Sequence, residues 1–135
     1  MKTLSGGCLC GNVEYSITDN LMYAGYCHCS ECRRWTGAPF SATGGVKNTD
    51  FELIKGESFL SSYKKGKNSN SYFCNNCSSI VYGKVPEHSM TYVMLGTLLE
   101  TPSLKPQWHM YTDSKLEWFQ ICDDLPQYTK APITE

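Results

Sequence analysis

Length, composition and charge restrict what this chain can be. Its 135 residues suffice for one domain with a modest hydrophobic core, and we expect a single domain over residues 1–135. The formal net charge of −1 gives no electrostatic basis for binding nucleic acid or an anionic membrane, so neither is an expected partner.

The N-terminal segment and the cysteine content predict a cytoplasmic protein. The first ten residues, "MKTLSGGCLC", contain one lysine and lack the apolar run of a signal peptide. The longest apolar stretch, "TYVMLGTLL", is too short to cross a bilayer. Because cytosolic thiols stay reduced, the eight cysteines are better explained as metal ligands or redox groups than as a disulfide framework.

Short β-rich segments recur along the chain and predict an all-β fold. In chain order they span residues 12–17, 39–46, 51–56, 71–74, 79–84, 90–96, 107–112 and 117–121, with Gly, Asn, Asp or Pro between them. One short helical turn is expected in "SECRRWTG", with Ser30 as its N-cap and Gly37 as its stop. We expect residues 123–135, which include two prolines, to lie over the surface or to fray.

Seven of the eight cysteines fall into three short motifs. These are a C-x-C pair, a C-x-C-x-x-C triplet and a C-x-x-C pair, made by Cys8 and Cys10, by Cys27, Cys29 and Cys32, and by Cys74 and Cys77. A structural zinc takes four protein ligands, whereas a catalytic zinc takes three and leaves one position open. Neither pair can hold zinc alone. We therefore predict two zinc ions per chain, one bound by both pairs and one bound by the triplet.

Other partitions of these residues remain open at this point. Cys29 and Cys32 could join the C-x-x-C pair in a zinc ribbon, which would leave three cysteines unused. His28 could close the triplet, although a residue between ligands at i and i+2 points to the opposite face of an extended segment. An iron–sulfur cluster would use the same thiolates, but neither ferredoxin spacing is present, which favours zinc. All the cysteines could also be purely structural.

The ordered motifs resemble a known family. The segments "GGCLCGNVEYSI", "CHCSECRRWTGAPFSATGGV", "FCNNCSS" and "WHMYTDSKLEWFQICDDLPQY" are similar to the glutathione-dependent formaldehyde-activating enzymes, whose domain is shared with centromere-associated vertebrate proteins. The resemblance runs from about Ser5 to Tyr128. It implies an Mss4-like fold of twisted antiparallel sheets around zinc, and the same division of the cysteines, with the triplet as the catalytic site. One departure is visible: the family usually has C-x-x-C-G-S, and this chain has Ser78 in place of that glycine.

The resemblance also implies a reaction. The expected function is that of a carbon–sulfur lyase which forms or cleaves S-hydroxymethylglutathione or a related thiol adduct, with glutathione and an aldehyde as partners. Zinc held by three thiolates can accept a further sulfur and remove its proton. His28, Arg33 and Arg34 are candidate substrate-binding residues, because guanidinium binds carboxylate in a bidentate manner. Adjacent helical residues point in different directions, so both arginines are not expected to serve the same group.

A non-catalytic alternative is a zinc-stapled module that binds a protein partner. Closure of the second zinc site by His28 or Cys122 would favour it. Cys122 has no cysteine near it in sequence, and we expect a buried, inert thiol. Trp35 and Phe40 are expected to pack the helical turn onto the sheet. Trp108 and its neighbour His109 should point to opposite faces of a strand, with Trp108 in the core.

Overall fold

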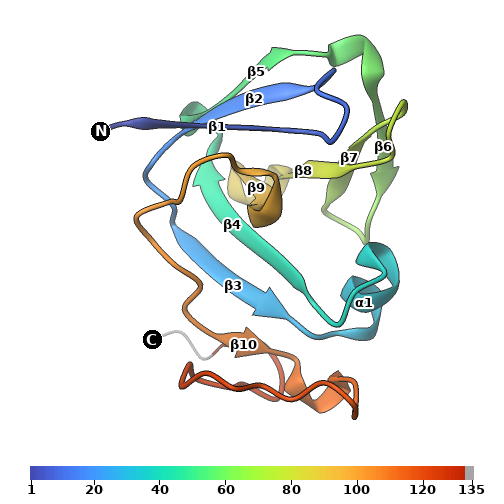
Figure 1. The fold of residues 1–135 in the computed structure, drawn as a ribbon, viewed down its shortest axis with the longest axis vertical. Helices are drawn as coiled ribbons and strands as arrows, with labels where there is room; N and C mark the ends of the chain where they lie inside the picture. The colour runs from blue at the N-terminus through green and yellow to red at the C-terminus, as the bar shows by residue number, and fades with distance from the viewer. Residues whose placement is uncertain (133–135) are drawn as a thin grey trace.

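Two twisted β-sheets and one short helix make up the computed structural model, which describes residues 1–132 (Figure 1). The smaller sheet has the order β1-β2-β5, with β1 at Thr3–Gly7, β2 at Glu14–Thr18 and β5 at Phe51–Lys55. The larger sheet has the order β10-β3-β4-β9-β8-β7-β6. Its strands are β3 (Tyr23–Cys27), β4 (Ser41–Lys47), β6 (Leu60–Lys64), β7 (Asn70–Cys74), β8 (Ile80–Val85), β9 (Met90–Met94) and β10 (His109–Met110). The predicted all-β class is confirmed.

Helical structure is confined to short segments. The α-helix α1 spans Ser30–Thr36. Single 3₁₀ turns occur at Asn48–Asp50, Glu57–Phe59, Pro86–His88, Leu95–Thr97 and Thr112–Ser114. Within residues 1–132, no helix has both the length and the apolar character needed to span a membrane.

Most of the expected strands are present. All but the last of the predicted segments contain a strand, although residues 107–112 contribute only two strand residues, and residues 117–121 contain a turn at Glu117 and Trp118 and no strand. Three strands, β1, β3 and β6, were not expected. Their sequences, TLSGG, YAGYC and LSSYK, contain glycines or exposed polar residues that weaken the strand signal, and their neighbours in the sheets supply the pairing.

The N-cap of the helix lies one residue earlier than expected. Cys29, not Ser30, has the extended N-cap conformation, and its sulfur accepts a hydrogen bond from the backbone N–H of Cys32 at 3.3 Å. A residue that caps with its side chain stands one position before the first helical residue, and here a thiol takes the role usually filled by a hydroxyl. Gly37 ends the helix as predicted, with a left-handed φ of 68°.

Aromatic rings lie directly over glycines at several places in the sheets. Tyr23 on β3 covers its cross-strand partner Gly45, and Tyr92 on β9 covers its cross-strand partner Gly83. A Cβ atom on Gly83 would lie 2.0 Å from the Tyr92 ring, so a side chain there would displace the ring. These glycines therefore fix where the two tyrosine rings lie.

The core forms where the two sheets face each other. Leu4, Val13, Tyr15 and Ile17 come from the smaller sheet and its loop, and Val46, Val81, Tyr82 and Val93 come from the larger one. The alternating burial of β2, with Tyr15 and Ile17 buried between more exposed neighbours, is the pattern of a strand with one face in the core.

The C-terminal segment is held by backbone hydrogen bonds, so of the two expected outcomes, lying over the surface or fraying, residues 123–132 show the first. The His109 N–H donates to Pro126 O at 2.9 Å, and the Tyr128 N–H donates to His109 O at 2.8 Å. A further bond joins the Tyr111 N–H to Lys130 O at 3.0 Å. The segment therefore runs alongside β10 at the edge of the larger sheet (Figure 1). The last part of the expectation, residues 133–135, lies outside the described residues.

Candidate metal centres and the pocket beside them

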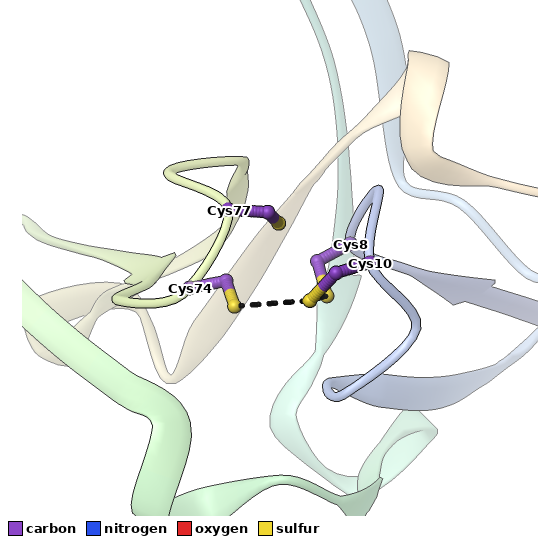
Figure 2. Close-up of side chains that lie close together, drawn as sticks. All are labelled: Cys8, Cys10, Cys74 and Cys77. Carbon is purple, nitrogen blue, oxygen red and sulfur yellow. Dashed lines mark hydrogen bonds between the residues drawn. The ribbon is translucent and has the colours of Figure 1, made fainter.

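Two cysteine pairs, distant in sequence, meet at one point. Cys8 and Cys10 follow β1, and Cys74 and Cys77 frame the turn after β7 (Figure 2). The Sγ atoms of Cys8 and Cys10 are 3.6 Å apart, those of Cys10 and Cys74 are 3.7 Å apart, and all four lie within 4.8 Å of one another. A zinc tetrahedron with Zn–S bonds of 2.3 Å places its sulfurs about 3.8 Å apart, whereas a disulfide requires about 2.05 Å. The four sulfurs fit a metal ion and not a disulfide.

Both turns that carry these cysteines pass through a left-handed residue. In the first turn it is Gly11, with a φ of 83°, and in the second it is Ser78, with a φ of 69°. The Ser78 N–H closes the second turn by donating to Cys74 O at 2.7 Å. Ser78 is the position where the related family usually has glycine. The turn is therefore kept, and a residue with a Cβ atom occupies a conformation that favours glycine.

Ser79 connects the two turns. Its hydroxyl oxygen accepts from the Leu9 N–H at 3.0 Å and lies 3.3 Å from the Cys77 sulfur. The hydrogen bond from Ser79, together with the Cys10 backbone N–H, lowers the pKa of Cys77 to about 5. Hydrogen bonds to a thiolate stabilise the form that binds metal. This arrangement suits a thiolate ligand.

The triplet forms a second sulfur group. Cys27 ends β3, Cys29 caps α1 and Cys32 lies within α1, and their Sγ atoms all lie within 4.8 Å of one another. A hydrogen bond from Cys27 lowers the pKa of Cys32 to about 5, against the effect of burial, and raises the pKa of Cys27. Ser41 and Cys29 donate further hydrogen bonds to Cys32. These hydrogen bonds favour the thiolate form of Cys32, the form in which cysteine binds a metal ion.

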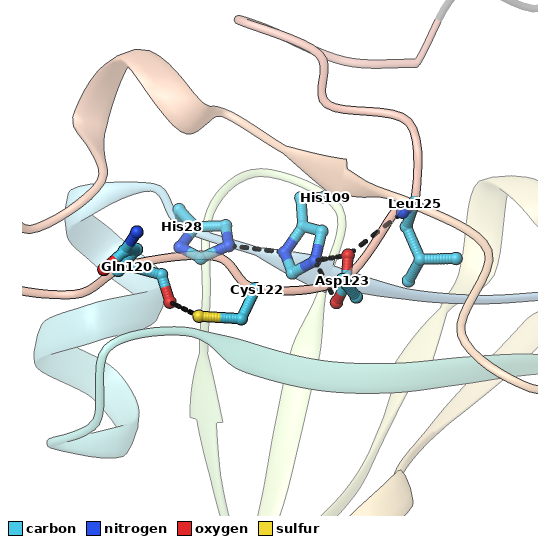
Figure 3. Close-up of polar contacts among 6 residues, drawn as sticks. All are labelled: His28, His109, Gln120, Cys122, Asp123 and Leu125. Carbon is cyan, nitrogen blue, oxygen red and sulfur yellow. Dashed lines mark hydrogen bonds and ion pairs between the residues drawn. The ribbon is translucent and has the colours of Figure 1, made fainter.

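No fourth side chain completes the triplet within the described residues. The group contains no histidine, carboxylate or further cysteine, and it is separate from the Cys74 and Cys77 pair, so the zinc-ribbon pairing does not form. His28 lies outside the group. Cys122 also lies elsewhere: it is exposed, with its sulfur 3.6 Å from Gln120 O (Figure 3), which corrects the expectation of a buried thiol. The triplet offers three ligands.

A pocket of about 160 Å³ adjoins the triplet. Its lining combines hydroxyl groups, aromatic rings and one ammonium group: Tyr23, Cys27, Cys32, Trp35, Ser41, Thr43, Lys65, Ser69, Tyr92 and Met110. The Lys65 ammonium lies 4.8 Å from the centre of the Trp35 ring and lowers the pKa of Cys32 by its charge. Tyr23 on β3 and Tyr92 on β9, whose rings lie over Gly45 and Gly83, both line this pocket.

The two arginines after the triplet point in different directions, in agreement with their adjacent helical positions. Arg34 is exposed and lines a groove of about 330 Å³ next to Trp35 and Lys65. Arg33 is half-buried, and its Nε atom is buried without a hydrogen-bond partner among the described residues. The structure thus places Arg34, but not Arg33, in the groove. Trp35 also contacts Tyr92 on the sheet, with ring centres 6.2 Å apart, as expected for a residue that packs α1 onto the strands.

Behind the triplet, three polar side chains form a chain of hydrogen bonds (Figure 3). His28 Nε2 lies 2.8 Å from His109 Nδ1, and His109 Nε2 lies 3.0 Å from the Asp123 carboxylate. In the tautomer in which His109 Nε2–H donates to the carboxylate, His109 Nδ1 accepts from His28 Nε2–H. His28 Nδ1 is then an acceptor, and it is buried without a partner among residues 1–132.

Burial disfavours the charged form of His28, the inner end of this hydrogen-bonded chain. His28 is fully buried, and this burial, with the nearby His109 and Lys115, lowers the pKa of His28 to about 4. The His109 hydrogen bond lowers the pKa of Asp123 at the outer end. His28 is not part of the triplet's sulfur group, and its ring packs against Phe40 at 5.3 Å between centres.

Trp108 and His109 occupy different surroundings. His109 is buried, and Trp108 is half-buried with its ring over Gly25 and stacked on Tyr23 at 6.0 Å between centres. Trp108 thus covers the sheet near its edge and does not enter the main core. The short pairing of β10 with β3, which is parallel, places His109 beside Tyr26 and so within reach of His28.

Sequence reasoning missed Lys65 and Asp123. The run "YKKGKNS" reads as an exposed turn, and Lys67 and Lys64 are indeed exposed, but Lys65 turns back onto Trp35. A signal was available: Tyr63 and Lys65 are two apart on a strand and its continuation, so they share a face. No signal in the sequence pairs Asp123 with His109, since their contact depends on the course of the C-terminal segment.

Comparison with known proteins agrees with this geometry. The family described as "Glutathione-dependent formaldehyde-activating enzyme" matches residues 3–114. A protein of Emericella nidulans named "Putative glutathione-dependent formaldehyde-activating enzyme" is 27% identical over 78 residues, which cover 58% of this chain and 40% of that protein. The crystal structure of a Rhodobacter sphaeroides protein covers 73% of this chain and 91% of its own, with a TM-score of 0.60 and 23% identity, and shows a shared fold. Because the family match extends over most of its length, this chain belongs to the glutathione-dependent formaldehyde-activating enzyme family.

Proposed function

We propose that this protein is a zinc-dependent carbon–sulfur lyase that forms or cleaves S-hydroxymethylglutathione or a closely related thiol adduct. The observation that supports the proposal most is the triplet of Cys27, Cys29 and Cys32, which has three sulfurs and no fourth side-chain ligand among the described residues, next to a pocket of about 160 Å³. Three protein ligands with one open position are typical of catalytic zinc. The family name supplies the substrates, glutathione and formaldehyde.

The reaction needs a thiolate and a polarised carbonyl group held together. In the forming direction, the substrate sulfur bonds to the carbonyl carbon, the carbon–oxygen double bond becomes a single bond, and the thiol proton ends on the new hydroxyl oxygen. Zinc bound by the triplet would supply a Lewis acid that lowers the pKa of the substrate thiol. Cleavage is the same step in reverse and returns the hydroxyl proton to the sulfur.

The residues around the pocket have roles that follow from their chemistry. The Lys65 ammonium reduces the negative charge that several thiolates place in one site. The Tyr23 and Thr43 hydroxyls are 3.4 Å apart and line the pocket, and in this proposal they would hydrogen-bond the aldehyde oxygen and pass a proton to it. Trp35 and Tyr92 limit the access of water from the side of α1.

The four-cysteine group has a structural role in this proposal. It joins the turn after β1 to the turn after β7, so a bound ion ties the smaller sheet to the larger one. Its four ligands leave no open position, which is the arrangement of a structural zinc.

The test must separate catalysis from the spontaneous addition of thiols to formaldehyde. We would measure by NMR the exchange rate between ¹³C-formaldehyde and S-hydroxymethylglutathione at equilibrium, with and without zinc-loaded protein. The wild type should accelerate the exchange, Cys32→Ser should not, and Cys122→Ser, an exposed cysteine outside both groups, should behave as the wild type. A wild-type protein with two zinc ions that leaves the exchange rate unchanged would contradict the proposal and support a binding module.

A further inference from the structure

A groove next to the triplet pocket brings together charges of both signs. It has a volume of about 330 Å³ and is lined by Glu31, Arg34, Trp35, Tyr63, Lys65 and Gly66. Trp35 and Lys65 line the triplet pocket as well, so the groove and the pocket share a wall. A molecule whose sulfur reaches the triplet can therefore extend over Trp35 into the groove.

The groove forms because a hairpin turn lies against α1 (Figure 1). The turn between β6 and β7 is closed by a hydrogen bond from the Lys65 N–H to Ser69 O at 2.7 Å. The same residue places its ammonium 4.8 Å from the centre of the Trp35 ring, a cation–π contact that holds its side chain over the helix. The position of Lys65 is thus set by the turn and by the ring.

The charged groups of the groove are available to a ligand. Glu31 and Arg34 are three residues apart on α1, which places them on neighbouring positions of one helical face. Among the described residues, neither has a salt bridge or a side-chain hydrogen bond, and the same holds for the Lys65 ammonium. One carboxylate and two cations therefore line the same groove with no ion pair or side-chain hydrogen bond to the described residues.

We propose that this groove binds the amino-acid end of a γ-glutamyl thiol, an inference that rests on the proposed function of the triplet. The γ-glutamyl group of glutathione ends in one ammonium and one carboxylate on the same carbon. Arg34 and Lys65 suit the carboxylate, and Glu31 suits the ammonium. An extended chain spans about 3.5 Å per residue, so this end lies roughly 7 Å from the cysteine sulfur, one pocket away from the triplet.

With this groove, the protein discriminates between thiol substrates by their γ-glutamyl end, which takes no part in the reaction. A site with charges of both signs rejects an analogue that lacks either charge, because one protein charge is then left without its partner. Binding at a distance from the reacting atoms should appear in KM and not in kcat. Small thiols without this end should react with a higher KM.

The experiment uses glutathione and two analogues that differ at one group each. Glutaryl-cysteinylglycine lacks the ammonium group, and 4-aminobutanoyl-cysteinylglycine lacks the carboxylate. With the wild type, each analogue should raise the KM of formaldehyde exchange about tenfold relative to glutathione, the change expected from one charge-assisted hydrogen bond. Arg34→Gln should raise the KM for glutathione about tenfold and leave that of the carboxylate-free analogue unchanged. Glu31→Gln should also raise the KM for glutathione about tenfold and should leave the KM for the ammonium-free analogue unchanged. Lys67→Gln, an exposed lysine outside the groove, is the matched control.

The outcomes separate this inference from the proposed function. If the wild type accelerates exchange equally for all three thiols, or if Arg34→Gln and Glu31→Gln change all three KM values alike, the groove is not the site for this end, while the lyase function stands. If the wild type accelerates exchange for none of the thiols, the proposed function is wrong and the inference falls with it.

Discussion

His28 and His109, 81 positions apart in sequence, share a buried hydrogen bond of 2.8 Å between Nε2 and Nδ1. His28 lies between two cysteines of the triplet, and His109 is held in turn by Asp123 of the C-terminal segment. This pair therefore connects the triplet segment to the C-terminal segment, in addition to the backbone hydrogen bond from the His28 N–H to Met110 O.

We expect His109→Gln to lower the free energy of unfolding by about 2 kcal/mol, because the glutamine amide replaces Nε2–H toward Asp123 but not Nδ1, and the buried His28 Nε2 loses its partner. It should also speed zinc loss from the triplet, since His28 is then less firmly held. Urea unfolding and zinc release to a coloured chelator measure the two effects. Asp123→Asn keeps an acceptor for His109 Nε2, so it should change the free energy of unfolding and the rate of zinc loss much less. Equal zinc release from all three proteins would show that the pair only supports the fold.

The turn after β7 can be stabilised by restoring a glycine. Ser78 has a φ of 69°, and a left-handed residue with a Cβ atom costs roughly 1–2 kcal/mol. The greater freedom of glycine in the unfolded chain offsets part of this, so Ser78→Gly should raise the free energy of unfolding by about 0.5 kcal/mol. Ser79→Gly, next to it, should instead be destabilising, because it removes the hydroxyl that contacts Leu9 and Cys77. Urea unfolding of the zinc-loaded proteins tests both, and a destabilised Ser78→Gly would contradict the strain argument.

The glycine under Tyr92 should matter for both stability and the pocket. A methyl group at residue 83 would lie 2.0 Å from the ring, so Gly83→Ala should cost about 1–3 kcal/mol and push Tyr92 toward the triplet pocket. Formaldehyde exchange by the folded fraction should fall as well. Gly96→Ala is the control, because a Cβ there meets no atom within 4 Å. The packing argument is wrong if the two variants unfold at the same denaturant concentration.

Burial of Tyr15 predicts a loss of stability at alkaline pH. Tyr15 is 1% exposed and donates to Thr97 Oγ1 at 2.7 Å, and burial raises the pKa of Tyr15 from 10 to about 12. Between these values the unfolded chain ionises this residue and the folded chain does not, so the stabilisation present below pH 10 is lost as the pH rises toward 12. Tyr15→Phe should lose about 1 kcal/mol less than the wild type between pH 9 and pH 11 in urea unfolding. Parallel losses in the two proteins would contradict this account.

The fold class and the grouping of the cysteines follow from local sequence, whereas the polar surroundings of the triplet do not. Motif spacing places Cys27, Cys29 and Cys32 together because they lie in one short segment, and the count of ligands pairs the remaining motifs. The contacts of Lys65 with Trp35 and of Asp123 with His109 arise from a hairpin turn and from a segment docked by backbone hydrogen bonds. The two-residue spacing of Tyr63 and Lys65 indicates a shared face but not the contact with Trp35, and nothing in the sequence indicates the contact of Asp123 with His109.

The same reason explains the wrong expectations. The strands β1 and β3 contain glycines, which lower their intrinsic strand tendency, yet Gly6 and Gly25 lie under the rings of Tyr15 and Trp108 and so suit the sheet. Residues 117–121 are rich in aromatic and β-branched side chains, but Trp118 is exposed and Phe119 packs against Phe40 and His28 from a turn. In both cases tertiary packing, not local tendency, decided the structure.

Stepwise removal of zinc tests the central claim that the two cysteine groups have separate roles. A chelator would be titrated while zinc content, near-ultraviolet circular dichroism and glutathione binding are followed on the same sample. The triplet, with three ligands from one segment, should release its zinc first, and glutathione binding should disappear while the tertiary signal stays. The second zinc, held by Cys8, Cys10, Cys74 and Cys77, should leave only with unfolding. Loss of both ions and of the tertiary signal in one step, or glutathione binding that survives in the one-zinc protein, would contradict the account.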